Sequence, residues 1–393
     1  MARREGPSPV VRVAGSFRDV DGAAWDHCAN PPGEAYNPFV SHAFLSALEE
    51  SGAAVPETGW YPRHLLLEAP DGVLLAAAPC YAKAHSQGEY VFDHGWAEAW
   101  HRAGGRYYPK LQISVPFTPV TGPRLLSAPG PMRARRRRQL AAAAVELARR
   151  MEASSAHITF LTEDEATLLE APAWLSRRDT QFHWLNQGYA SFDQFLAGLA
   201  SRKRKMIRKE RARVAEEGLD IEWVTGTGLT EAHWDAFFAF YMDTGGRKWG
   251  TPYLTRDFFS LIGARMGERV LLIMVKRGGR HIAGALNFIG SDALYGRNWG
   301  AIEHYEFLHF EACYYQAIEF AIAHRLCRVE AGAQGPHKLA RGYQPVATRS
   351  AHHIADPAFS RAVADYLARE RRAVGEDQLY LGERTPFRRN GGD

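Results

Sequence analysis

The sequence has few cysteines, and no part of it reads as a membrane span or a secretion signal. Its 393 residues include four cysteines, no two of which form a CxxC pair. This excludes a disulfide scaffold, argues against a structural zinc site and fits a reducing compartment. No apolar run approaches the roughly 18 residues that span a bilayer, and the first residues, MARREGPSPVVRVAG, lack the apolar region of a signal peptide. We therefore expect a cytoplasmic protein without integral membrane insertion.

Several catalytic motifs are also absent. The sequence contains no GxxxxGK[ST], no GxGxxG after a strand, no HExxH and no GxSxG. These absences disfavour Walker-type phosphoryl transfer, dinucleotide chemistry, zincin chemistry and α/β-hydrolase chemistry. His352 and His353 are adjacent, so their side chains project differently and make a poor metal pair. We expect no metal site.

Charge is nearly balanced, with 48 Lys and Arg against 44 Asp and Glu, a formal net charge of +4. A dedicated nucleic-acid-binding protein is usually more basic than this. Hydrophobic residues make up 46% of the chain and charged residues 23%, a composition that supports a sizeable core and excludes wholesale disorder. At this length we expect at least two domains.

One order of elements recurs in the two halves of the chain: a meander, a helix and a strand. In the first half, after a strand over 10–17 and a helix over 41–52 that Ser41 caps, the predicted elements are strands over 64–69, 73–84 and 89–96, a helix over 133–152 and a strand over 156–163. In the second half they are strands over 269–276, 281–289 and 293–300, a helix over 307–325 and a strand over 327–333. We interpret this order as a tandem duplication with domains at 1–180 and 181–393, although such elements also recur by chance in α/β proteins.

A basic helical segment, 192–218, lies between the two predicted meanders. Eight of the twelve residues 202–213 are Lys or Arg. Charges on all sides predict an exposed helix that cannot pack by one face against a core. It is a candidate contact for tRNA, a nucleotide-diphosphate sugar or an anionic membrane, or it is a solvated arm supported by its own glutamates.

Particular strings of the sequence resemble a known family. These are NPFVSHAFLSALEESG (37–52), HSQGEYVFDHGWA (85–97), YYPKLQISVPFTPVTGPRLL (107–126), LHFEACYYQAIEFAI (308–322) and EAGAQGPHKLARGYQPVATRSAHHI (330–354). Together they look like the bacterial FemAB-like "peptidoglycan biosynthesis/recognition" family of the GNAT superfamily. The resemblance covers essentially the whole chain. It implies an α/β (α+β) fold of tandem GNAT-like domains, each a mostly antiparallel mixed sheet flanked by helices.

The resemblance also implies a reaction, transfer of an acyl or aminoacyl group to an amine, with a muropeptide or other small molecule as acceptor. Acyl-CoA and aminoacyl-tRNA are the candidate co-substrates, and no tightly bound cofactor is expected. In the GNAT fold a loop Q/R-x-x-G-x-G/A at a helix N-terminus cradles the pyrophosphate of coenzyme A. The nearest match starts at Arg297 and includes Trp299 and Gly300, but Ile302 replaces the final small residue. Because of this difference from the coenzyme A loop, an aminoacyl-tRNA remains a candidate donor.

The segment from 327 onwards carries the candidate catalytic groups. Glu330 and Gln334 share one face of the predicted strand, where Glu330 is either a general base or a structural carboxylate paired with an arginine. His337, Lys338 and Arg341 follow and suit a base, an oxyanion donor or phosphate contacts, or else form a solvated loop. We expect Glu330, Gln334, His337 and Lys338 to line one cleft with Tyr295 or Arg297.

Other candidates are weaker. On the helix over 307–325, Tyr315 is either a general acid or a core residue with a satisfied hydroxyl, and His309 lies beside the apolar stripe. Tyr295, Arg297 and Trp299 are candidate substrate contacts on the last meander strand, or cross-strand pairs. In the first half, candidate acceptor contacts occur in proline-rich segments that are otherwise ordered connectors: Asp93, Tyr108, Lys110 and Thr118.

Two rival functions come from other classes. One is a non-catalytic recognition module for cell-wall fragments or nucleotide sugars, favoured if ionisable groups fail to converge in the second cleft. The other is an RNA-binding accessory protein, which would bind with a steep salt dependence.

Overall fold

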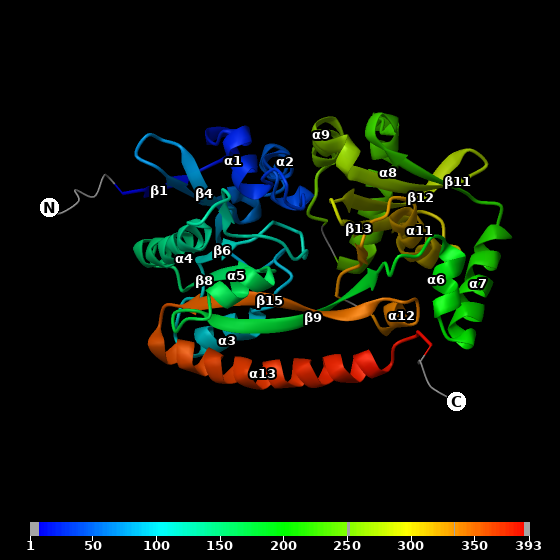
Figure 1. Cartoon of the computed structure of the whole chain (residues 1–393). Coiled ribbons are helices and arrows are strands. Elements are labelled where there is room, and N and C mark those ends of the chain that lie inside the picture. Colours follow the sequence, from blue (N-terminus) through cyan, green and yellow to red (C-terminus); the bar gives the residue numbers. More distant parts are fainter. Residues whose placement is uncertain (1–7, 250–251, 334, 389–393) are drawn as a thin grey trace. The chain divides into compact units, whose positions relative to one another are not determined.

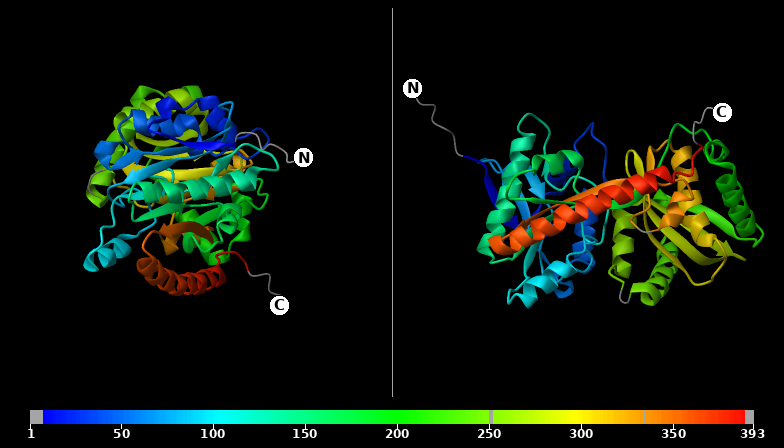
Figure 2. Two further views of the ribbon diagram at one scale, coloured as in Figure 1. Left: turned by 90° about the vertical axis from the view of Figure 1, so that its left-hand side faces the viewer. Right: turned by 90° about the horizontal axis from the view of Figure 1, so that it is seen from below.

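The structure is a computed structural model that describes residues 8–249, 252–333 and 335–388 (Figure 1). It divides into two compact units, unit 1 (Met1–Asp179 with Thr348–Ala373) and unit 2 (Thr180–Ala347 with Val374–Asp393). The chain passes between them within the strands β9 (Leu175–Leu185) and β15 (Gln344–Ile354) and within the 27-residue helix α13 (Pro357–Glu383), the long red helix in Figure 2. The sequence pattern had assigned everything after 180 to the second domain. Segment Thr348–Ala373 instead joins unit 1, because β15 pairs with a strand of that unit.

Unit 1 contains two sheets. A small antiparallel sheet, in the order β1-β3-β4-β7, is formed by β1 (Val10–Ala14), β3 (His64–Glu68), β4 (Leu74–Ala78) and β7 (Leu126–Ser127). The strands of its second sheet, in the order β2-β5-β6-β8-β15, are β2 (Trp60–Pro62), β5 (Cys80–Lys83), β6 (Lys110–Ile113), β8 (Ser155–Thr159) and β15. The helices are α1 (Gly22–Ala29), α2 (His42–Glu50), α3 (His94–Arg102), α4 (Arg133–Arg150) and α5 (Glu163–Leu168).

The first meander forms only in part. Ser41 caps α2 as predicted, since its side chain accepts a hydrogen bond from the Phe44 N–H. The predicted strand over 73–84 is broken at Pro79 into β4 and β5, which belong to different sheets. The prediction of a strand over 89–96 was wrong, because Asp93 instead precedes helix α3.

Unit 2 is built on one sheet in the order β10-β11-β12-β13-β14-β9. Its strands are β10 (Asp220–Thr225), β11 (Val270–Arg277), β12 (Arg280–Ile289), β13 (Ala293–Ala301), β14 (Arg328–Glu330) and the second part of β9. The helices are α6 (Phe192–Gly198), α7 (Ser201–Ala215), α8 (Glu231–Trp249), α9 (Arg256–Met266), α10 (Leu308–Phe310), a π-helical turn (Glu311–Tyr315), α11 (Gln316–Ala323) and α12 (Pro336–Leu339). The second predicted meander is confirmed as β11, β12 and β13.

Both units contain a parallel strand pair inside an otherwise antiparallel arrangement. In unit 2, β13 pairs in parallel with β14, and β14 is antiparallel to β9. In unit 1, β6 pairs in parallel with β8, and β8 is antiparallel to β15. A helical crossover joins each parallel pair, α10 to α11 in unit 2 and α4 in unit 1. The fold is thus the tandem α/β arrangement that the sequence indicated.

The helix between β13 and β14 covers the core of unit 2. Its Ala317, Ile318 and Ala321 pack with Leu294 and Val329 of the sheet, and all five are buried. The predicted helix over 307–325 is confirmed, but its middle is π-helical, so the even 3.6-residue spacing is interrupted at Glu311–Tyr315. Strand β14 is also shorter than predicted. It ends at Glu330, and Gly332 follows with a left-handed φ of 72°, which takes the chain out of extended geometry.

The basic helix α7 is more one-sided than its sequence indicated. Its helical state is confirmed, and Lys205 is exposed while Arg204 is half-buried. The prediction that no face packs against a core was wrong, since Ile207, Glu210 and Val214 form a buried stripe. A carboxylate within the stripe explains why hydropathy alone did not reveal it. Within the described part of the chain, no helix combines the length and apolarity that a bilayer crossing requires.

One prediction concerns the packing of α8 on the sheet of unit 2. A Cβ atom at residue 300 would collide with the backbone of Phe240 on α8. Gly300→Ala should therefore lower the free energy of unfolding by about 1–3 kcal/mol, measured as a shift of the urea midpoint. Gly375→Ala is the matched control, because a Cβ there meets no neighbour within 4 Å in a helix, and it should be neutral or stabilising by up to about 1 kcal/mol. Equal midpoints for the two variants would contradict this packing.

Candidate functional site

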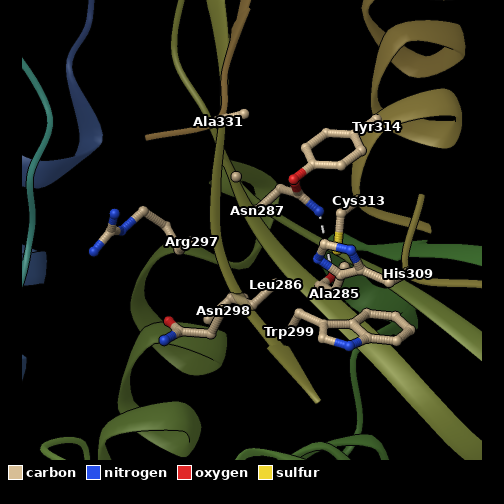
Figure 3. A pocket seen from close by; sticks show the side chains of 11 residues that line it. Ala285, Leu286, Asn287, Arg297, Asn298, Trp299, His309, Cys313, Tyr314 and Ala331 are labelled. Atoms are coloured by element: carbon tan, nitrogen blue, oxygen red, sulfur yellow. Dashed lines mark hydrogen bonds between the residues drawn. The ribbon is translucent and has the colours of Figure 1, made fainter. Parts of the chain in front are cut away.

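The parallel strands β13 and β14 of unit 2 stay together for three residue pairs only. Ala293, Leu294 and Tyr295 pair with Arg328, Val329 and Glu330. Beyond Tyr295, β13 continues to Ala301, whereas the chain beyond Glu330 leaves the sheet. A cavity of about 110 Å³ opens where the strands separate (Figure 3). Its lining residues are Ala285, Leu286, Asn287, Gly296, Arg297, Asn298, Trp299, His309, Cys313, Tyr314 and Ala331.

A β-bulge shapes the strand side of the cavity. The register of β13 against β12 shifts between Asn298, which pairs with Leu286, and Gly296, which pairs with Asn287. Arg297 is therefore the extra residue, and its side chain points away from the side of β13 on which His309, Cys313 and Tyr314 lie (Figure 3). At the bulge, the backbone of β13 faces the cavity where the Arg297 side chain would otherwise lie.

The helix side of the cavity comes from α10 and the π-helical turn. Cys313 and Tyr314 lie in that turn, and the His309 ring packs edge-on against both Trp299 and Tyr314. Burial raises the pKa of Tyr314, whose hydroxyl lies 3.1 Å from His337 Nε2. A π turn widens a helix by one residue and is frequent at functional sites.

Two predicted residues of α12 contact residues that line this cavity. Lys338 is buried, and its ammonium donates hydrogen bonds to the carbonyls of Ala331 and Gly332, the latter at 3.2 Å. Burial lowers the pKa of Lys338 to about 8. Burial, and then the nearby cations Lys338 and Arg341, lower the pKa of His337, so its imidazole is neutral at pH 7. The site thus combines a neutral base, a phenol and a buried cation.

Arg341 and Tyr315 have a different environment, the contact between α7 and the π turn. Arg341 Nε donates to the Tyr315 hydroxyl at 2.9 Å, and its Nη2 donates to Glu210 Oε1 at 2.7 Å. The Tyr315 hydroxyl in turn donates to Glu210. All three side chains are buried and mutually satisfied. This arrangement favours the interpretation of Tyr315 as a core residue.

Glu330 lies on the opposite face of β14 from Val329 and the helix. Its Oε1 accepts a hydrogen bond from Arg328 Nε at 2.8 Å, and His183 Nε2 lies 3.6 Å from its Oε2. Tyr295 is its cross-strand neighbour, and the hydroxyl of Tyr295 accepts from Arg328 at 3.4 Å. The arginine-paired carboxylate that the sequence left open as an alternative is the arrangement observed. Among the described residues, Oε2 of Glu330 has no hydrogen-bond partner.

The expected single cleft is therefore divided. The structure brings His337 and Lys338 together beside Tyr314, whereas Glu330 and Tyr295 form a separate cluster with Arg328 and His183. Gln334 lies outside the described residues. The residue spacing did not predict this division. Strand β14 ends at Glu330, and successive side chains of a strand point to opposite faces.

The match to a coenzyme A loop also differs from expectation. Arg297 and Gly300 lie within strand β13, not at a helix N-terminus, and Gly300 serves the close approach of α8. The connection from β13 to α10, residues 302–307, contains Glu303 and Glu306. Glu303 is paired with Arg277 and Arg280, which leaves the exposed Glu306 as the acidic side chain that disfavours a pyrophosphate there.

The first-half candidates belong to a buried polar cluster in unit 1. The Lys110 ammonium donates to Ser86 Oγ at 2.8 Å, to Glu89 Oε2 at 2.7 Å and to Asp93. The Tyr108 hydroxyl lies 2.8 Å from Ser86 Oγ. Thr118 is separate, since its hydroxyl donates to the Pro116 carbonyl. Burial raises the pKa of Glu89 to about 7, and the charge of Lys110 opposes this rise. Glu89 therefore relies on Lys110 to stay ionised.

Several residues of the cavity were missed from the sequence, among them Asn287, Cys313 and Tyr314. The lone Asn287 in the apolar strand HIAGALNFI was an available signal, and it is fully buried in β12. Cys313 and Tyr314 were counted in the apolar stripe of the helix. The π turn that places them beside the cavity has no signature in residue spacing.

The fold and the site define a class, a tandem GNAT-like protein with a cavity between diverging parallel strands. A profile of the FemAB-like family, described as peptidoglycan biosynthesis/recognition, matches residues 16–389. The chain belongs to the FemAB-like family. At the level of the family this supports acyl or aminoacyl transfer.

Solved structures share the fold. The chain is similar to FemX, with 12% identity, a TM-score of 0.53 and coverage of 90% of this chain and 100% of that chain. It is also similar to a conserved protein of unknown function from Bacteroides thetaiotaomicron, with 9% identity, a TM-score of 0.51 and coverage of 88% and 100%. A tandem GNAT protein from the clavulanic acid biosynthesis pathway aligns with 12% identity, a TM-score of 0.48 and coverage of 89% and 99%. No curated protein matches the sequence.

The buried lysine of unit 1 generates a prediction. Lys110→Met leaves Glu89 and Asp93 buried without their cation, which should destabilise the protein by about 3–5 kcal/mol. The measurement is the urea midpoint at pH 8. Lys205→Met, an exposed lysine on α7, should change stability by no more than about 0.5 kcal/mol. A Lys110→Met protein as stable as the control would show that the cluster is solvated.

Proposed function

We propose that this protein transfers an aminoacyl group to an amine of a peptidoglycan precursor, with the reaction in unit 2. The observation that carries the proposal is the cavity at the separation of β13 and β14, two of whose lining residues, Tyr314 and Ala331, contact His337 and Lys338. Family membership supports the substrate class. We place the reaction in the cytoplasm, where nucleotide-activated precursors and charged tRNA are found.

The size of the cavity suits the reacting end of a donor. At about 110 Å³ it admits only a small group, so the bulk of the donor and the acceptor lies outside. The acceptor amine must lose a proton as it attacks the ester carbonyl. His337 is neutral at pH 7 and lies next to the Tyr314 hydroxyl, so the proton passes to His337 through Tyr314, and it is returned to the ribose oxygen of the tRNA as the ester C–O bond breaks.

Lys338 supplies the positive charge that the reaction needs. As the amine attacks, the carbonyl oxygen becomes an oxyanion, and a buried cation stabilises it more than an exposed one does. The carbonyls of Ala331 and Gly332 fix the ammonium at the edge of the cavity. Ala331 itself lines the cavity.

The donor is an aminoacyl-tRNA in this proposal, and acyl-CoA is the alternative. The acidic connection after β13 disfavours a coenzyme A pyrophosphate. Helix α7 docks on unit 2 through Glu210 and through Arg211, which pairs with Glu311 and Glu319 at 2.8 Å. Its outward face keeps exposed cations, among them Lys205, Arg208 and Lys209, which suit a phosphate backbone.

We do not assign Lys110 and Asp93 to direct acceptor contacts, because both are buried and bonded to each other. Their contribution to acceptor binding in unit 1 is to hold the segment around Tyr108 in place.

The proposal predicts the effect of removing the cation. Lys338→Met should lower kcat by about a hundredfold to a thousandfold, measured by mass spectrometry of a UDP-linked muropeptide incubated with charged tRNA. Arg361→Met, an exposed residue on α13, is the control and should retain full turnover. A folded Lys338→Met protein with normal turnover would favour a recognition module instead.

The pH dependence tests the same two residues. Lys338 is charged below its pKa of about 8, so the rate should fall as the pH rises through that value. His337 must be neutral, so the rate should also fall as the pH drops below a pKa that lies under 6.5. The alkaline limb should disappear in Lys338→Met. A flat profile between pH 6 and 9 in the wild type would contradict the assignment.

The donor is tested by Lys205→Gln combined with Lys209→Gln. Removing two phosphate contacts should weaken tRNA binding and reduce the slope of log K against log salt by nearly two. Turnover with acyl-CoA, if any occurs, should be unchanged. Equal salt slopes in wild type and variant would exclude this face of α7 as the tRNA contact.

A further inference from the structure

Three potential metal ligands converge in unit 2, away from the residues of the cavity. They are Glu222 on β10, His233 in the first turns of α8 and His281 on β12. Their ligand atoms all lie within 4.8 Å of one another. The side chains are partly buried, with 36%, 17% and 20% of their surface exposed.

The distances suit a small divalent cation. Two ligands of a tetrahedral zinc site, each about 2.0–2.2 Å from the metal, are about 3.4 Å apart. His281 Nε2 lies 3.2 Å from Glu222 Oε1, and His233 Nε2 lies 4.0 Å from the same oxygen. A small side-chain rotation of His233 completes the triangle.

The surroundings of His233 also fit a ligand. Its Nδ1 accepts a hydrogen bond from the Thr230 backbone N–H at 3.2 Å and lies 2.9 Å from the Thr230 hydroxyl. With a metal on Nε2, the proton would move to Nδ1, which would give up the bond from the backbone N–H and donate to the Thr230 hydroxyl instead. Metal-bound histidines usually have such a second partner, which fixes the tautomer and the ring.

The Lys276 ammonium would compete with a metal ion for the Glu222 carboxylate. Its ammonium lies 2.7–2.8 Å from both carboxylate oxygens of Glu222. A cation already neutralises the carboxylate, and a divalent ion would replace it. Lys276 is the penultimate residue of β11, and 28% of its side chain is exposed, so it has room to withdraw.

We propose that Glu222, His233 and His281 form a zinc site, with water as the fourth ligand. Two imidazoles and a carboxylate are a ligand set that zinc accepts. The ion would tie the start of α8 to β10, the strand at the outer end of the described sheet of unit 2, and to β12. The site is independent of the proposed transfer reaction.

The first test is binding of Zn²⁺ to the full-length, tag-free protein after treatment with a chelator. Competition with a chromophoric chelator should give one tight site per chain, and the melting temperature should rise with zinc concentration. Cobalt should substitute and give the visible spectrum of a tetrahedral site. Absence of a tight stoichiometric site in the wild type would overturn the proposal.

Variants identify the ligands. His281→Ala and His233→Ala should each weaken zinc binding by at least about tenfold, whereas His304→Ala, an exposed histidine, should leave it unchanged. Unchanged binding in both ligand variants would place the zinc elsewhere and overturn the assignment.

Two further variants keep every ligand and so remain informative if the alanine variants unfold. Thr230→Val should weaken binding about 10–100-fold through loss of the second partner of His233. Lys276→Gln should strengthen binding several-fold, because the competing ammonium is gone. A structural ion-pair network without a metal site predicts no change in zinc affinity for either variant, and that result would overturn the proposal.

Discussion

The parallel pairing of β13 and β14 over only three residue pairs determines where a cavity opens in unit 2. A parallel pair that continued along the full length of β13 would fill the space with cross-strand side chains. It ends because Gly332 takes up a left-handed conformation directly after the strand, and because the bulge at Arg297 turns a large side chain away. The backbone of β13 is thereby exposed beside a helix whose own π turn adds an extra residue. The cavity is the shared result of these three local irregularities.

Buried charge organises the two units in different ways. In unit 2, Glu210 lies in the apolar stripe of α7 and accepts hydrogen bonds from Tyr315 and Arg341. Together with the Arg211–Glu311 pair, this carboxylate ties the basic helix to the π turn. In unit 1, Lys110 holds Ser86, Glu89 and Asp93, which come from one loop, against β6. Such pairs contribute little net stability compared with apolar packing, but they penalise any other arrangement of the segments that carry them.

Local patterns predicted the regular parts of the fold. The second meander, the capped helix α2 and the helix before β14 followed from apolar spacing and turn residues. The predictions failed where the backbone departs from regular geometry: at Pro79, which divides a strand between two sheets, and at Gly332, which ends β14. The same limit applied to the site. His337 and Lys338 became candidates because they follow a predicted strand, whereas the position of Cys313 and Tyr314 depends on a π turn that has no periodic signature. The ligands Glu222, His233 and His281 are separated by 11 and 48 residues along the chain, so only the fold reveals that they meet.

The crossing strands have a consequence for dissecting the protein. A fragment ending at residue 179 would contain most of unit 1 but would lack β15, the partner of β8. The free edge of β8 would then present unpaired N–H and C=O groups to any other strand, which is the usual origin of aggregation in truncated sheet proteins. Because residues 348–373 complete a unit that starts the chain, unit 1 finishes folding only after nearly all of unit 2 has been synthesised. Residues after 373 belong to unit 2 in turn, so neither unit is complete until the segment after residue 347 has been synthesised.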